Sequence, residues 1–168
     1  MVERDLLLAV AEVSVGLAGF SAIVGLLGSR SGRSELKVDA LRLQVMLEMS
    51  LMVAAFAFLP VLVSSFDFEV WTTWRISSAA FLIVAIPSEF LALRRTQNMP
   101  DMKLNRLNIN TVNWALSLSA DFIMLVVVIG LFESQAGAFY LLAVFCILVM
   151  AGILFVQFAA STFMPSEY

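Results

Sequence analysis

The chain has 168 residues, of which 61% are hydrophobic, and it carries a net charge of −3 with no histidine. Soluble domains are nearer about 45–50% apolar, and a chain this short could not bury so much apolar surface in a soluble core. Without histidine it lacks the commonest metal ligand and general base, and its ten basic residues form no continuous patch for nucleic acid. We therefore predict an integral membrane protein with the lipid bilayer as partner, no nucleic-acid partner, no cofactor and no enzymatic activity.

Five segments are long and apolar enough to cross a bilayer, whose hydrocarbon core is about 30 Å thick and needs about 20 apolar residues in a helix. These spans comprise residues 6–27, 43–65, 70–93, 111–132 and 138–160. The stretch 94–107 contains four basic residues and Pro100, and it is predicted to form a loop. Short connections favour antiparallel neighbours. The sequence therefore predicts an all-α bundle of five membrane helices in one transmembrane domain, residues 1–168.

The basic residues are distributed unevenly around these spans. Eight of the ten lie in the stretches 29–37 and 94–107 or at Arg42, just inside the second span, whereas Arg4 and Arg75 lie on the opposite side. Loops rich in lysine and arginine usually stay in the cytoplasm. We therefore expect both stretches to face the cytoplasm, which puts the N-terminus outside and the C-terminus in the cytoplasm.

The first span carries one charge, Glu12, and a face of small residues. This face comprises Ser14, Ala18, Ser21, Gly25 and Gly28. Small residues let membrane helices approach closely, so the face predicts a packing seam against another span or another copy of the chain. Glu12 matches Arg75 of the third span in predicted depth and is opposite in charge. Because an unpaired charge is costly in lipid, we predict that these two residues form a structural ion pair, within one chain or between subunits.

Carboxyl groups also lie toward the cytoplasmic ends of the second and third spans. In the second span, Gln44 and Glu48 are one helical turn apart, and in the third span Glu89 follows closely after Pro87. Proline removes a helical hydrogen bond, and carboxylates beside broken helical turns form cation sites in some transporters. These groups are therefore candidates for a cation or proton site. The alternative for the third span is an ordinary proline kink.

The fourth span has a polar stripe on one helical face, whereas the fifth carries no charge. The stripe comprises Asn110, Asn113, Ser117 and Asp121, and no polar side chain follows between residues 122 and 131. A spacing of three and four residues places side chains on one face of a helix. We interpret the stripe as a proton or cation path that opens to the cytoplasm and ends at Asp121. The alternative is a helix interface held by side-chain hydrogen bonds without transport.

Three stretches carry a resemblance to a known class of protein. They are GLAGFSAIVGLLGSR, RLQVMLEMSL with the later FLPVLVSS, and WRISSA, which together extend over the first three spans. They are similar to small, uncharacterised multi-pass proteins of bacterial inner membranes. The resemblance implies a bacterial origin and an inner-membrane location, and it implies no activity and no functional residues.

Two functions follow from these observations. The first is a homo-oligomeric membrane protein that forms an ion or proton path, because the interior of one 18.5 kDa bundle is narrow and subunit association is an easy route to a pore. The second is a scaffold or accessory subunit that binds lipid or partner membrane helices and transports nothing. A continuous polar lining would favour the first, but the outer half of the fourth span supplies none.

Overall fold

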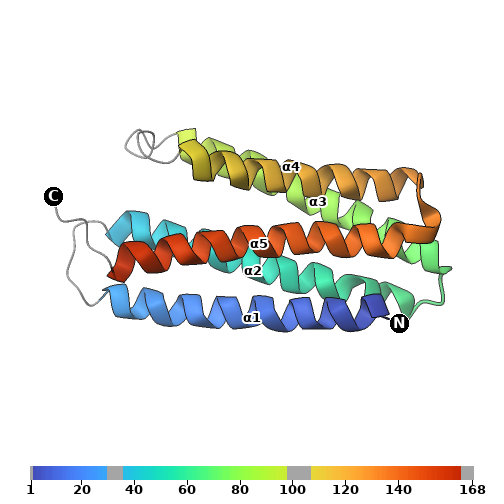
Figure 1. The fold of residues 1–168 in the computed structure, drawn as a ribbon, viewed down its shortest axis with the longest axis horizontal. Helices are drawn as coiled ribbons and strands as arrows, with labels where there is room; N and C mark the ends of the chain where they lie inside the picture. The colour runs from blue at the N-terminus through green and yellow to red at the C-terminus, as the bar shows by residue number, and fades with distance from the viewer. Residues whose placement is uncertain (1, 30–35, 98–106, 164–168) are drawn as a thin grey trace. The chain divides into compact units, whose positions relative to one another are not determined.

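The computed structural model describes residues 2–29, 36–97 and 107–163, and these residues are helical apart from short connections (Figure 1). The elements are α1 (Val2–Ser29), α2 (Leu36–Ser64), α3 (Val70–Gln97), α4 (Leu107–Ile129), the 3-10 turn η2 (Glu133–Gln135) and α5 (Ala136–Phe163). Each of the five α-helices contains a stretch long and apolar enough to cross a membrane. The prediction of an all-α, multi-pass membrane protein is thus confirmed, with spans close to those read from the sequence.

The helices differ from the predicted spans mainly at their ends. Residues 94–97 were predicted to belong to a loop, but they are the last residues of α3, and the Arg94 guanidinium lies 4.4 Å from the centre of the Phe90 ring. Hydropathy marks where apolar side chains stop, whereas a helix continues wherever its backbone hydrogen bonds continue, and arginine is a good helix former. Residues 29, 36 and 37 of the first predicted basic loop and residue 107 of the second are also helical, while residues 30–35 and 98–106 lie outside the described residues.

The chain divides into two compact units, which are described separately. The first comprises Met1–Phe58 with Ile147–Tyr168, and the second comprises Leu59–Cys146. The first therefore contains α1, most of α2 and the later part of α5, while the second contains α3, α4 and the start of α5. Because α2 and α5 contribute to both units, this division does not contradict a single transmembrane domain, which stays a prediction.

In the first unit, the small residues of α1 form a packing seam that meets α2. Ser14 and Ser21 are fully buried, and their hydroxyls donate to the carbonyls of Ala11 and Leu17, at 2.8 and 2.5 Å. A Cβ atom at Gly25 would lie 2.5 Å from a methyl carbon of Leu43 in α2. At Gly25 the seam therefore packs against another helix of the same chain, which is one of the two arrangements expected from the sequence.

In the second unit, α3 packs along α4, and α5 starts against α3. Trp74 of α3 stacks on the buried ring of Tyr140, with ring centres 5.5 Å apart, and a Cβ atom at Gly137 would lie 3.0 Å from the Trp74 ring. The start of α5 therefore approaches α3 closely because position 137 has no side chain.

A left-handed glycine ends α4. Gly130 has φ +83°, its N–H reaches the carbonyl of Val127 at 3.1 Å, and the N–H of Leu131 reaches that of Val126 at 3.4 Å. These are the two hydrogen bonds of a Schellman motif, in which a glycine adopts the conformation that other residues avoid. The motif ends α4 at Ile129, three residues before the end of the predicted span.

Candidate functional site

Two contacts fix how α3 and α4 lie against each other. Near the end of α3, the Ser117 hydroxyl of α4 donates to the Glu89 carboxylate. Near the start of α3, Arg75 Nε donates to the carbonyl oxygen of Val128 in α4 at 2.9 Å. Arg75 and Glu89 are fourteen residues apart, so positions between them at alternating spacings of three and four share the α4-facing side of α3. We call this contact line the α3–α4 seam.

The seam brings together three of the residues that the sequence predicted separately. Glu89 of α3 and Ser117 of α4 are joined directly, and Asp121 lies one turn beyond Ser117 on the same helix. The Asp121 carboxyl lies within electrostatic interaction range of the Glu89 carboxyl. All three side chains are partly buried. We call these three residues the carboxyl cluster.

The two acids of the carboxyl cluster are suited to sharing one proton. An ionised carboxylate only accepts hydrogen bonds, so a bond between two carboxyls exists only when one of them carries a hydrogen. The Ser117 hydroxyl donates to Glu89, and two neighbouring carboxylates repel each other when both are ionised, which favours a state with one proton on the pair. Chemically, the cluster can hold one proton between two acids and can exchange it.

The polar stripe continues from the cluster toward the start of α4. Asn113 lies one turn before Ser117, and its side-chain oxygen is buried with no hydrogen-bond partner among the described residues. Asn110 belongs to the first turn of α4, and its side chain lies outside the described part of the structure. A buried amide oxygen of this kind accepts a hydrogen bond from water readily. Asn113 therefore extends the polar surface toward the end where α3 stops and α4 begins.

The proline near Glu89 does not break its helix. α3 runs continuously through Pro87 to Gln97. The next residue, Ser88, donates its hydroxyl to the carbonyl of Ala85 at 2.8 Å, a bond within the same helix. Glu89 therefore reaches Ser117 from a helix that is not interrupted at this proline, and cation binding by Glu89 stays a prediction.

The other predicted path residues lie in the first unit. Gln44 Nε2 donates to Glu48 Oε1 at 2.7 Å, which confirms that they share a helical face, and both side chains are exposed. Because these residues and the carboxyl cluster belong to different units, the participation of Gln44 and Glu48 in one path with Asp121 stays a prediction.

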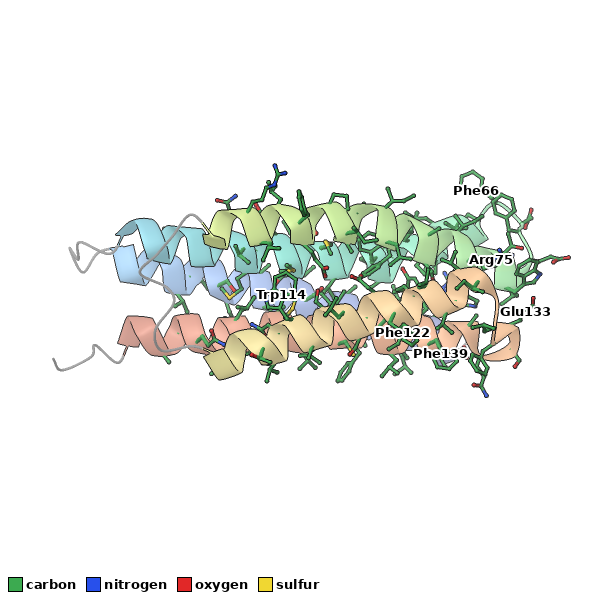
Figure 2. All side chains as sticks on the ribbon, turned by 90° about the horizontal axis from the view of Figure 1, so that it is seen from above. Phe66, Arg75, Trp114, Phe122, Glu133 and Phe139 are labelled. Atoms are coloured by element: carbon green, nitrogen blue, oxygen red, sulfur yellow. The ribbon has the colours of Figure 1, made fainter. Side chains whose placement is uncertain are left out.

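Arg75 has partners that the sequence did not suggest. Its guanidinium lies 5.0 Å from the centre of the Trp71 ring and bonds to the Val128 carbonyl near the end of α4. Figure 2 shows Arg75 at the end of the unit that also carries Glu133, whereas Trp114 lies nearer the opposite end. Glu12 is exposed on α1 in the first unit. The predicted Glu12–Arg75 ion pair therefore stays a prediction, while the contacts of Arg75 with α4 and Trp71 are established.

Sequence reasoning named every member of the carboxyl cluster but not their association. Their association depends on the rotation and register of α3 against α4. Neither can be predicted from the hydropathy or the residue spacing of a single helix. It also missed Trp71, although an aromatic residue four positions before an arginine on one helix is a recognisable stacking pattern. Comparisons with protein-family models, with curated proteins and with solved structures found no match to this chain.

Proposed function

We propose that this multi-pass membrane protein conducts protons, and that Glu89 and Asp121 on the α3–α4 seam bind the proton in transit. The observation that carries the proposal is that two carboxyls from neighbouring membrane helices lie within interaction range of each other, where sharing one proton relieves their repulsion. Acidic residues inside membrane spans are costly, and they commonly mark proton or ion pathways. The Ser117 hydroxyl holds Glu89 in position, so that the shared proton lies between two fixed acids.

The polar residues of α4 support access from one end. Asn113, Ser117 and Asp121 follow one another at intervals of one turn, starting near the end of the seam where α3 stops and α4 begins. The stretch that links these two helices is basic, so we assign this end to the cytoplasm, the N-terminus to the outside and the C-terminus to the cytoplasm. In this orientation a proton enters from the cytoplasm and meets the carboxyl pair partway across the membrane.

The setting of this activity is also part of the proposal. The resemblance to small multi-pass proteins supports residence in a bacterial inner membrane. The protein acts without catalysis or cofactor and forms a homo-oligomer, for which the large exposed apolar side chains on all five helices leave ample surface. A mass measurement in several mild detergents tests the oligomer, and a monomer in all of them would exclude it.

Proton flux into liposomes tests the central claim. The purified protein is reconstituted with a pH-sensitive dye inside the vesicles, and a pH gradient with a potassium-valinomycin potential drives the flux. Asp121→Asn keeps the size and hydrogen-bonding capacity of the side chain but cannot release a proton, so flux is lost. Ser119→Ala is the matched control, because Ser119 lies on the same helix, is exposed and bonds only to the Ala115 carbonyl of its own helix.

A scaffold without transport is the second candidate, and the Ser117–Glu89 bond favours it. This bond ties α3 to α4 whether or not a proton moves. On that reading the parent protein shows no flux, and Ser117→Ala lowers its stability. Flux that is equal in the parent and in Asp121→Asn would show instead that a path exists elsewhere and that Asp121 is structural.

A further inference from the structure

Two adjacent serines of α3, Ser77 and Ser78, differ from several other serines of this protein. Both are fully buried, and neither hydroxyl has a hydrogen-bond partner among the described residues. Ser50 of α2 shares this property, whereas the hydroxyls of five other helical serines donate to a carbonyl three or four residues earlier, namely those of Ser14, Ser21, Ser64, Ser88 and Ser119. A buried hydroxyl without a partner is destabilising. Each of the two hydroxyls can therefore bond to a group outside the described residues, such as a water molecule.

Ser78 lies on the α3–α4 seam, whereas Ser77 does not. Ser78 is three residues after Arg75 and eleven before Glu89, and both of these residues contact α4. The alternating spacing places Ser78, Leu82 and Ala85 on the same side of α3 between them. Ser77 is rotated by about 100° from Ser78, since a helix has 3.6 residues per turn.

Arg75 can supply the second polar partner for a water at Ser78. Its Nε is engaged by the Val128 carbonyl, and its two terminal nitrogens carry four further N–H donors. Side chains three residues apart on a helix are neighbours. An internal water needs two to four polar partners: the Ser78 hydroxyl can donate or accept, and Arg75, which contacts Val128 and Trp71, supplies donors from about one turn earlier on α3.

We infer that Ser78 and Arg75 bind a water molecule on the α3–α4 seam, and that this water accepts the proton on the far side of the Glu89–Asp121 pair. The second half of this inference rests on the proposed proton path. The later half of α4 has no polar side chains to line the path. In this inference the polar lining continues there on α3, at Ser78 and Arg75.

The register of the seam gives the separation of the two sites. The pairs Arg75–Val128 and Glu89–Ser117 place Asp121 opposite residues 82–85 of α3. Ser78 is four to seven residues from that level, which corresponds to about 6–10 Å along the helix. Met124 is fully buried in this interval. A proton therefore passes an apolar constriction about one to two turns long, where movement of a flexible methionine can admit water.

The charge of Arg75 lets this water pass a proton on but prevents it from holding the proton as a stable hydronium. A resident hydronium beside a guanidinium is disfavoured by like-charge repulsion. The proton leaves the Asp121 oxygen, moves to the water and is passed outward, while a second proton from the Asn113 side restores the carboxyl pair. One proton is taken up for each proton released, and no bond other than O–H forms or breaks.

Ser78→Ala tests the inference, with Ser77→Ala as the matched control of equal burial on the same helix. Infrared spectra of the reconstituted protein in H₂¹⁶O and H₂¹⁸O detect internal waters through O–H stretching bands that shift with the isotope. We expect Ser78→Ala to lose one such band and to reduce proton flux about fivefold, the equivalent of one hydrogen bond. The carboxyl C=O band of the Glu89–Asp121 pair persists. Ser77→Ala keeps the band that Ser78→Ala loses, and it conducts protons like the parent.

The two proposals fail in different ways. If Ser78→Ala keeps every isotope-sensitive band and raises the thermal unfolding temperature, the hydroxyl holds no water and the inference is overturned. If the band is lost but flux in Ser78→Ala equals that of the parent, the water is present and its role as proton acceptor is overturned. If Asp121→Asn conducts like the parent, the proposed function fails, and the band of Ser78 still decides whether the water is bound.

Discussion

Replacing Arg75 by alanine removes three identified interactions. The hydrogen bond from Nε to the Val128 carbonyl involves a charged donor, which contributes about 1.5–3 kcal/mol. Stacking on Trp71 at 5.0 Å contributes about 0.5–1 kcal/mol. A cation near the C-terminal end of α4 adds about 0.3–1 kcal/mol. Because Arg75 is only partly buried and such contributions do not simply add, we expect Arg75→Ala to lower the free energy of unfolding by about 2–3 kcal/mol.

Denaturant unfolding in detergent micelles, followed by tryptophan fluorescence and circular dichroism, measures this loss. Arg75→Lys keeps the charge but loses the planar guanidinium, which bonds to a carbonyl and stacks on a ring at the same time. We therefore expect lysine to recover less than half of the unfolding free energy that alanine loses. A double-mutant cycle of Arg75→Ala with Trp71→Leu isolates the stacking, with an expected coupling of about 0.5–1 kcal/mol. A cycle with Glu12→Gln tests the predicted ion pair. If Arg75→Ala unfolds within about 0.5 kcal/mol of the parent, the assigned contacts do not stabilise the protein.

Three further predictions concern glycines and topology. Gly137→Ala should destabilise the protein by about 1–3 kcal/mol, because its new Cβ meets the Trp74 ring, which is already stacked on Tyr140. Gly25→Ala should be nearly neutral, because only a methyl group of Leu43 must move and helix propensity improves by about 1 kcal/mol. Thermal unfolding compares the two, and equal losses would contradict this difference. Gly130→Ala should cost about 1–2 kcal/mol, since alanine is strained at φ +83°, and an unchanged melting temperature would argue against the Schellman motif. Cysteines introduced at Ser31 or Asn98, in a variant without the native cysteine, should resist a membrane-impermeant thiol reagent in intact cells; ready labelling of both would reverse the orientation.

The membrane helices could be predicted from the sequence with small errors at their ends. Lipid solvates each span individually, so length and hydropathy of a local segment suffice to locate it. The polar stripe of α4 was predictable for the same reason, since residues on one helical face follow from spacing alone. The end of α4 could not be predicted in this way. Apolar residues continue to position 132, but the left-handed conformation of Gly130 ends the helix at Ile129.

Associations between helices had to come from the tertiary structure. Glu89 and Asp121 were both recognisable as carboxyl groups that are destabilising in lipid, but the sequence did not show that they lie within interaction range of each other. For Arg75, opposite charge and similar depth suggested Glu12, whereas the structure provides a backbone carbonyl and an aromatic ring as partners. An arginine can be stabilised by several kinds of group, so charge alone does not select its partner.

The sequence by itself determined that this chain has five segments long and apolar enough to cross a membrane, and which of their residues are destabilising in lipid. Both properties depend on the transfer of single segments and single side chains from water to lipid. Only the tertiary structure decided that Glu89, Ser117 and Asp121 form one cluster and that Ser78 lies on the same seam. The rotation and register of α3 against α4 result from close packing over their whole length, and no residue or local pattern specifies them in isolation.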